Sequence, residues 1–115
     1  MTNSTKTPAK FRKAAAVANE VALRAGELHN SITDGHEVTA LQIRELGFEL
    51  ATVNNKRKSS VDASTAAFFF DAAAAFGTAG LAVHQGNLDL AAEKLDEGAA
   101  RLEGVEEHVA GLFRR

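Results

Sequence analysis

The sequence predicts an all-α protein, an up-down-up-down four-helix bundle built from two helical hairpins. Alanine is abundant, the single proline stands at position 8, and runs of β-branched residues are missing, all of which favours helix. Apolar residues recur three and four positions apart in four segments that short polar or glycine-containing turns separate. Helices joined by such short turns run antiparallel to their neighbours. The alternative architecture is an open helical-hairpin repeat that dimerisation completes.

The length of 115 residues suits one domain with a hydrophobic core. Residues 1–8 begin with an aperiodic run of Thr, Ser, Asn and Lys and are expected to form a disordered N-terminal tail, and residues 9–115 a single helical-bundle domain. A formal net charge of −2 excludes a polyanion binder of the histone type. Because the basic residues near the start precede an apolar run too short for a signal peptide, we expect a cytoplasmic protein.

The first helix is expected over about residues 8–31. Pro8 suits a helix start, where its missing N–H costs no hydrogen bond. Asp34 and Gly35 then end the helical pattern. One heptad stripe runs along this segment and consists of Phe11, Ala14, Ala18, Val21, Ala25, Leu28 and Ile32.

The second helix is expected over about residues 35–54. Asp34 and Glu37 form a possible capping box at its start. A polar stretch over residues 54–60 predicts the turn after it. The buried stripe is expected to contain Ile43, Leu46, Leu50 and Val53, widened by Leu41 and Phe48.

The third helix, over about residues 61–84, is apolar nearly all round and is expected to be covered on most sides. Ser60 is the expected N-cap, with Asp62 in the first turn. The only charge between Ser64 and Val83 is Asp71. The segment is therefore long enough to cross a bilayer, but a mid-span Asp costs about 2.5–3.5 kcal/mol. A helix buried by its neighbours is the favoured interpretation, and no membrane partner is expected.

The fourth helix is expected over about residues 88–113, with Asn87 as its cap. A strict three-four alternation predicts a left-handed supercoil around a partner helix. Gly98 on this stripe suggests a close neighbour. The stripe consists of Leu88, Ala91, Leu95, Gly98, Leu102, Val105, Val109 and Leu112.

Two further patterns concern how the helices are arranged. The first helix is mainly basic and the fourth mainly acidic, which favours placing them side by side. A shift of 51 positions aligns Gly26 with Gly77, and it aligns two further glycine pairs, at 35 and 86 and at 47 and 98. This internal similarity suggests two related hairpins with glycine at each bend.

No catalytic, cofactor-binding or metal-binding motif is visible, so an enzyme is not predicted. The absence of cysteine excludes thiolate sites. None of the four histidines, at positions 29, 36, 84 and 108, has a carboxylate three or four residues away, the spacing that bundle metal sites use. No cofactor is expected.

Asp71 is the most informative single residue, because a carboxylate within an apolar helix needs a partner or an opening. Arg44 on the second helix is a candidate partner. The simpler interpretation of Asp71 is a structural ion pair or a solvent-facing strip. A small-ligand or enzymatic site around it is an alternative function.

Phe68, Phe69 and Phe70 fan out at 100° per residue, so one of them can reach the surface. The favoured function is a non-enzymatic protein–protein interaction module, such as an adaptor, inhibitor, immunity protein or assembly factor. It would bind a protein partner or a second copy, as a homo-oligomer, through an apolar helical face. The candidate partner-binding residues are Phe68, Phe69, Phe70, Asp71 and Arg44.

Nucleic-acid binding is the remaining alternative. Basic residues gather near the N-terminus and in the turn before the third helix, where they could meet phosphates. The residues are Lys10, Arg12, Lys13, Lys56, Arg57 and Lys58.

Overall fold

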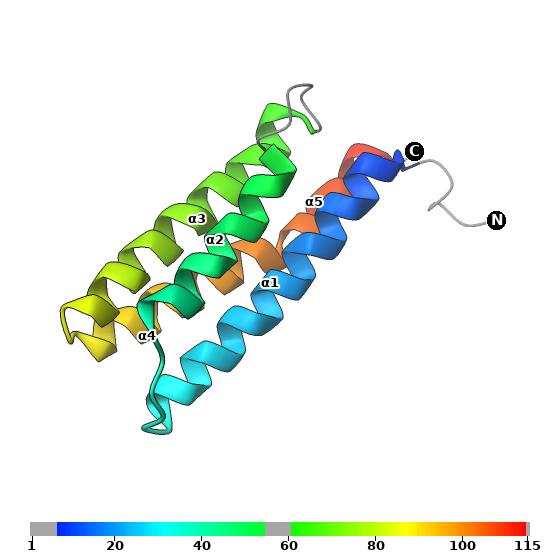
Figure 1. Ribbon diagram of the computed structural model, residues 1–115. Coiled ribbons are helices and arrows are strands. Elements are labelled where there is room, and N and C mark those ends of the chain that lie inside the picture. Colours follow the sequence, from blue (N-terminus) through cyan, green and yellow to red (C-terminus); the bar gives the residue numbers. More distant parts are fainter. Residues whose placement is uncertain (1–6, 55–60, 115) are drawn as a thin grey trace.

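A computed structural model describes residues 7–54 and 61–114 and contains the predicted all-α bundle (Figure 1). Helix α1 packs against α2 and α4, α2 packs against α3, and α3 packs against α4. The ring of helices therefore closes within one chain, as an up-down-up-down bundle and not as an open repeat. The helices are α1 (Ala9–Thr33), α2 (Ala40–Asn54), α3 (Ala63–His84), α4 (Leu88–Glu103) and α5 (Val105–Leu112).

The two hairpin turns share one backbone geometry. Gly35 and Gly86 have φ angles of 85° and 79°, in the left-handed region that glycine favours. In both turns the amide after the glycine donates a 2.8 Å hydrogen bond to the carbonyl five residues earlier, which is the Schellman pattern. The two glycines are aligned by the shift of 51 positions, so the internal similarity extends to the conformation of the bends.

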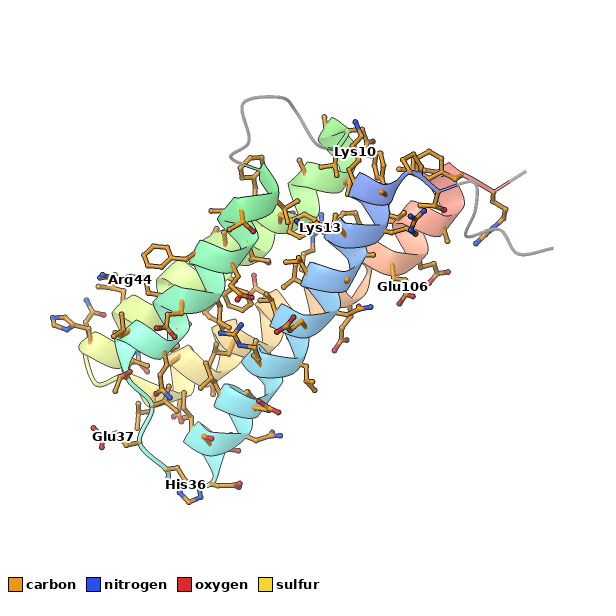
Figure 2. All side chains as sticks on the ribbon, turned by 45° about the vertical axis from the view of Figure 1, so that its right-hand side comes forward. Lys10, Lys13, His36, Glu37, Arg44 and Glu106 are labelled. Atoms are coloured by element: carbon orange, nitrogen blue, oxygen red, sulfur yellow. The ribbon has the colours of Figure 1, made fainter. Side chains whose placement is uncertain are left out.

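Helix α2 begins at Ala40, five residues later than expected. Thr39 and Gln42 form its capping box: the Thr39 hydroxyl accepts from the Gln42 amide at 3.2 Å, and the Gln42 side chain accepts from the Thr39 amide at 2.8 Å. The expected box at Asp34 and Glu37 is wrong because Asp34 belongs to the end of α1. Figure 2 shows Glu37 in the connection that leads to α2.

The apolar stripes of α1 and α2 are buried as predicted, with Leu28 half-buried. The proposed widening of the α2 stripe is wrong, because Leu41 and Phe48 are 58% and 60% exposed. These two side chains lie on the outer side of α2. Each lies two positions from a residue of the buried stripe, and at 100° per residue that spacing places it on the opposite side of the helix.

The N-cap of α3 is Asp62, whose side chain accepts from the Thr65 amide at 3.3 Å. The expected cap, Ser60, lies outside the described residues. Hydrogen bonds from Ser64 and Thr65 hold the pKa of the Asp62 carboxyl below its ordinary value of 3.8. The carboxylate is therefore the form that caps the helix.

Helix α3 is covered on fewer sides than its composition suggests. Phe69 and Phe76 point into the core and are 1% exposed. Among the described helices, α2 and α4 are the two that flank α3 closely, and Phe70 and Leu81 face outward. The expectation that most of this helix is covered is wrong, because only a third of its most apolar stretch is buried.

The predicted fourth helix is interrupted at Gly104, where α4 ends and α5 begins. The Phe68 ring packs at this break: a Cβ on Gly104 would lie 3.3 Å from its Cε1 atom. The stripe is buried from Ala91 to Val109, but its ends, Leu88 and Leu112, are exposed. The supercoil remains a prediction.

The predicted contact between the basic first helix and the acidic fourth segment is confirmed. On α1, Asn19 donates to Glu106 of α5 at 3.1 Å, and the His29 ring lies 2.9 Å from the Ala92 carbonyl oxygen of α4. Figure 2 shows Glu106 on the side of α5 near α1. Arg24 of α1 forms an ion pair at 2.9 Å with α2, not with α4.

Gly98 tests how closely α3 and α4 approach. A Cβ at Gly98 would overlap the Phe76 ring, lying 2.8 Å from Cζ and 2.9 Å from Cδ1. Because this ring is buried, we expect Gly98→Ala to lower the free energy of unfolding by about 1–3 kcal/mol. Gly26→Ala is the control, since its Cβ meets nothing within 4 Å, and it should raise stability by about 0.5–1 kcal/mol. Urea denaturation measures both, and equal effects would contradict the packing argument.

The cap of α3 predicts a pH-dependent stability. We expect Asp62→Ala to lower the free energy of unfolding by about 1 kcal/mol at pH 7. Because the folded pKa lies below 3.8, this contribution is complete above that value and is lost as the pH falls through the folded pKa. Urea denaturation at several pH values should therefore show the two proteins converging in acid. Asp62→Asn, which keeps a cap without a charge, is the control, and a constant difference down to pH 2 would refute this explanation.

Candidate interaction surface

An open groove of about 610 Å³ runs between α2 and α3 on the outside of the bundle. Three of its lining residues, Gly47, Gly77 and Gly80, have no side chain to fill it. Phe48 and Leu81, 60% and 56% exposed, form parts of its walls. The groove is thus a shallow apolar depression between two projecting side chains.

Beside the groove, one exposed apolar stripe runs along α3. It contains Phe70, Ala74, Gly77 and Leu81, and Phe70 is 61% exposed. We call this stripe, together with Arg44 and Phe48 of α2, the α2–α3 face. Figure 2 shows Arg44 on the side of α2 turned away from α1.

The three consecutive phenylalanines have three different environments. Phe69 is buried in the core, and Phe70 lies on the α2–α3 face. Phe68 is half-buried, with its ring 4.9 Å from the His108 ring and 4.5 Å from the Arg101 guanidinium. The sequence predicted that one of the three reaches the surface, and the structure identifies it as Phe70.

Asp71 pairs with Arg101 of α4 and not with Arg44. The Arg101 Nη2 and Nε atoms lie 2.8 and 3.0 Å from Asp71 Oδ2. Arg44 was the wrong choice because it lines the groove on the α2 side of α3, whereas Asp71 faces α4. The simpler interpretation, a structural ion pair open to solvent, is confirmed. Both residues line a second groove of about 660 Å³ between α3 and α4.

A serine, a histidine and an aspartate also meet near the start of α3, which the sequence analysis missed. His108 Nε2 lies 3.0 Å from Ser64 Oγ, and Ser64 donates a short hydrogen bond to Asp62. In a nucleophilic triad the histidine accepts the serine proton and the carboxylate orients the histidine. Here the Asp62 carboxylate, not the histidine, accepts the hydrogen bond that the serine hydroxyl donates, so the arrangement caps α3 and does not match a triad.

Among residues 7–54 and 61–114, no group of three or more His, Asp or Glu side chains is arranged to hold a metal ion. His29 instead contacts the Ala92 carbonyl near the end of α1. Within this part of the chain, α3 is the helix long and apolar enough to span a membrane by length and composition.

The basic residues of the nucleic-acid alternative are only partly described. Lys10, Arg12 and Lys13 lie on the first turns of α1, and Figure 2 shows Lys10 and Lys13 at one end of the bundle. The facing ends of α2 and α3 lie at that same end (Figure 1). Lys56, Arg57 and Lys58 fall between those ends in sequence and lie outside the described residues.

Comparison of the chain with protein-family models, with curated proteins and with solved structures found no match.

The ion pair on α3 and α4 predicts a small coupling energy. The Asp71 and Arg101 side chains are 56% and 45% exposed, so their interaction is screened by water. A double-mutant cycle with Asp71→Ala and Arg101→Ala, measured by urea denaturation, should give a coupling below about 1 kcal/mol. Arg101→Lys should lose stability as well, because lysine does not stack on Phe68 in the same way. A coupling above about 3 kcal/mol would mean that the pair is desolvated, contrary to the structure.

Proposed function

We propose that this protein is a non-enzymatic protein–protein interaction module that acts through the α2–α3 face. The observation that carries the proposal is the exposure of Phe48, Phe70 and Leu81 beside one glycine-lined groove. Contiguous apolar surface of this kind marks interaction sites on soluble proteins.

The energetics support a partner at this face. Full burial of a leucine or phenylalanine side chain contributes about 1.5–3 kcal/mol, and three such side chains are exposed on this face. The glycines between them let a partner side chain approach the backbone. Arg44 adds a cation at the edge of the groove. An adaptor, inhibitor, immunity protein or assembly factor, acting in the cytoplasm without a cofactor, would use such a face.

The other sequence-based functions have less support. Asp71 is neutralised by Arg101 and exposed, so a ligand or enzymatic site there lacks a desolvated reactive group. Nucleic-acid binding is favoured by Lys10 and Lys13, which lie together at one end of the bundle. Charge reversal at positions 56–58 should abolish a salt-dependent affinity for nucleic acid if that function is correct.

Site-specific photo-crosslinking tests the proposed face. We expect benzoylphenylalanine at Phe48 or at Phe70 to give a discrete protein adduct in the producing cells, because a partner covers these positions. Leu23 of α1 is the matched control, since it is 65% exposed and lines none of the described grooves. Gel electrophoresis with mass spectrometry detects the adducts.

A second substitution connects the adduct to the face. Leu81→Asp should remove the adduct formed at Phe70, because it places a charge on the same stripe, and Leu23→Asp should leave it unchanged. Absence of any adduct from both face positions, or the same adducts from position 23, would refute the proposed function.

A further inference from the structure

The exposed stripe of α3 is symmetric along its length. Its residues are Phe70, Ala74, Gly77 and Leu81, spaced four, three and four positions apart. Read from either end, the stripe is large, small, small, large. At 100° per residue all four lie within a narrow strip of the helix surface. The stripe is therefore unchanged in pattern by a two-fold rotation about a point midway between Ala74 and Gly77.

When two copies of α3 lie antiparallel, this two-fold rotation places the stripe of one copy against the stripe of the other. Phe70 of one copy then meets Leu81 of the other, and Ala74 meets Gly77. The small residues at the centre allow the two backbones to approach closely, and the large residues cover both ends. A parallel arrangement would instead stack Phe70 on Phe70 and leave Gly77 opposite Gly77, with no side chain between them.

Helix α2 supplies a second and independent indication of the same axis. A Cβ at Gly80 would lie 3.8 Å both from the Ala40 carbonyl oxygen and from Ile43 Cγ2, which fixes the register of the antiparallel helices. The centre of the α3 stripe lies on the N-terminal side of Gly80. Because α2 runs antiparallel to α3 with the same rise per residue, that centre is level with about position 46 of α2. That position is midway between Arg44 and Phe48.

The same two-fold axis therefore places Arg44 of one copy opposite Phe48 of the other, twice in the dimer. An arginine over an aromatic ring is a favourable contact, and the chain already makes one, since Arg101 lies 4.5 Å from the Phe68 centroid. Arg44 has no ion-pair or hydrogen-bond partner among residues 7–54 and 61–114. It is thus available for a contact with a second copy.

Charge does not oppose this pairing. Asp71 and Glu97, which line the groove between α3 and α4 beside Ala74, are paired within their own chain with Arg101 and Lys94. The positive charge of Arg44 faces an aromatic ring, not another cation. The occupant that fits both the stripe and the flanking α2 positions is a second copy of the chain.

We infer that the protein forms a two-fold symmetric dimer in which α3 packs antiparallel to α3 of the second copy. This inference rests on the proposed function and identifies the partner at the α2–α3 face. It assigns Arg44 and Phe48 to one contact across the interface.

Engineered cysteines test both the dimer and its direction, because the chain contains none. Purified Phe70→Cys and Leu81→Cys chains, one of them isotope-labelled, are mixed and oxidised. In the antiparallel dimer the two positions face each other, whereas identical positions lie about 16 Å apart along the helix, beyond the reach of a disulfide. Mass spectrometry should find the crossed disulfide in about tenfold or greater excess over either like pair.

The other outcomes are equally clear. An excess of like pairs would overturn the antiparallel arrangement. A yield no higher than that of Leu23→Cys, with sedimentation equilibrium giving the chain mass of 12.2 kDa, would overturn the dimer. In that case adducts of a different protein at Phe48 and Phe70 would still uphold the proposed function, whereas the absence of any adduct would remove both.

Further variants separate association from folding. Gly77→Gln should weaken dimerisation by about tenfold or more because it places a long side chain at the close approach. Gly26→Gln, at the aligned position of the first hairpin, should leave it unchanged. Both Cβ positions are open in the monomer.

Phe48→Trp supplies the only indole of the chain, and its fluorescence emission should shift to shorter wavelength as the protein concentration rises. Arg44→Gln should reduce this shift, and a monomer would not show it.

Discussion

The structure depends on the fact that α3 has more apolar surface than two neighbouring helices can cover. In a closed ring of four helices each helix has two flanking neighbours, and α3 has α2 and α4. Its inward residues, led by Phe69 and Phe76, make the centre of the core. The remaining side must face outward, and on this helix that side carries Phe70 and Leu81. The apolar surface is therefore a consequence of combining this composition with a four-helix ring.

The glycine residues determine where α3 packs tightly against a neighbouring helix and where a groove is left. On the α4 side of α3, the Phe76 ring fills the place that a side chain at Gly98 would take, and Phe68 packs at Gly104. These contacts bring α3 and α4 together. On the α2 side, a Cβ at Gly47 would meet nothing within 4 Å. Gly47, which the shift of 51 positions aligns with Gly98, instead lines the groove between α2 and α3.

Much of the fold could be predicted from the sequence because it depends on local pattern. Three-four periodicity identified the buried stripes, and glycine identified both bends. The start of α2 was missed although its signal, Thr39 followed three residues later by Gln42, is present in the sequence. A competing Asp-x-x-Glu pattern stood just before it. Only the turn geometry, in which Asp34 ends α1, decides between the two.

The candidate site was less predictable, because it depends on how each helix is rotated. Periodicity places Phe48, two positions from both Leu46 and Leu50, on the side of α2 opposite the core, but it does not tell which part of α3 lies beside it. The partner of Asp71 required the same information. Asp71 and Arg44 lie on helices that touch, yet they occupy different sides of α3. Arg101 could be chosen only once the position of α4 was known.

The apolar composition of α3 is typical of a membrane span, but the same apolar residues also cover the buried stripes of the neighbouring helices. If α3 left the bundle for a bilayer, the buried stripes of α2 and α4, including Leu46 and Leu95, would lose their cover. The Asp71–Arg101 pair would be broken, and a carboxylate would enter the hydrocarbon. Covering only the outer stripe of α3 removes the remaining apolar surface from water and keeps every contact inside the bundle. The proposed association at the α2–α3 face therefore demands less reorganisation of the fold than insertion into a bilayer.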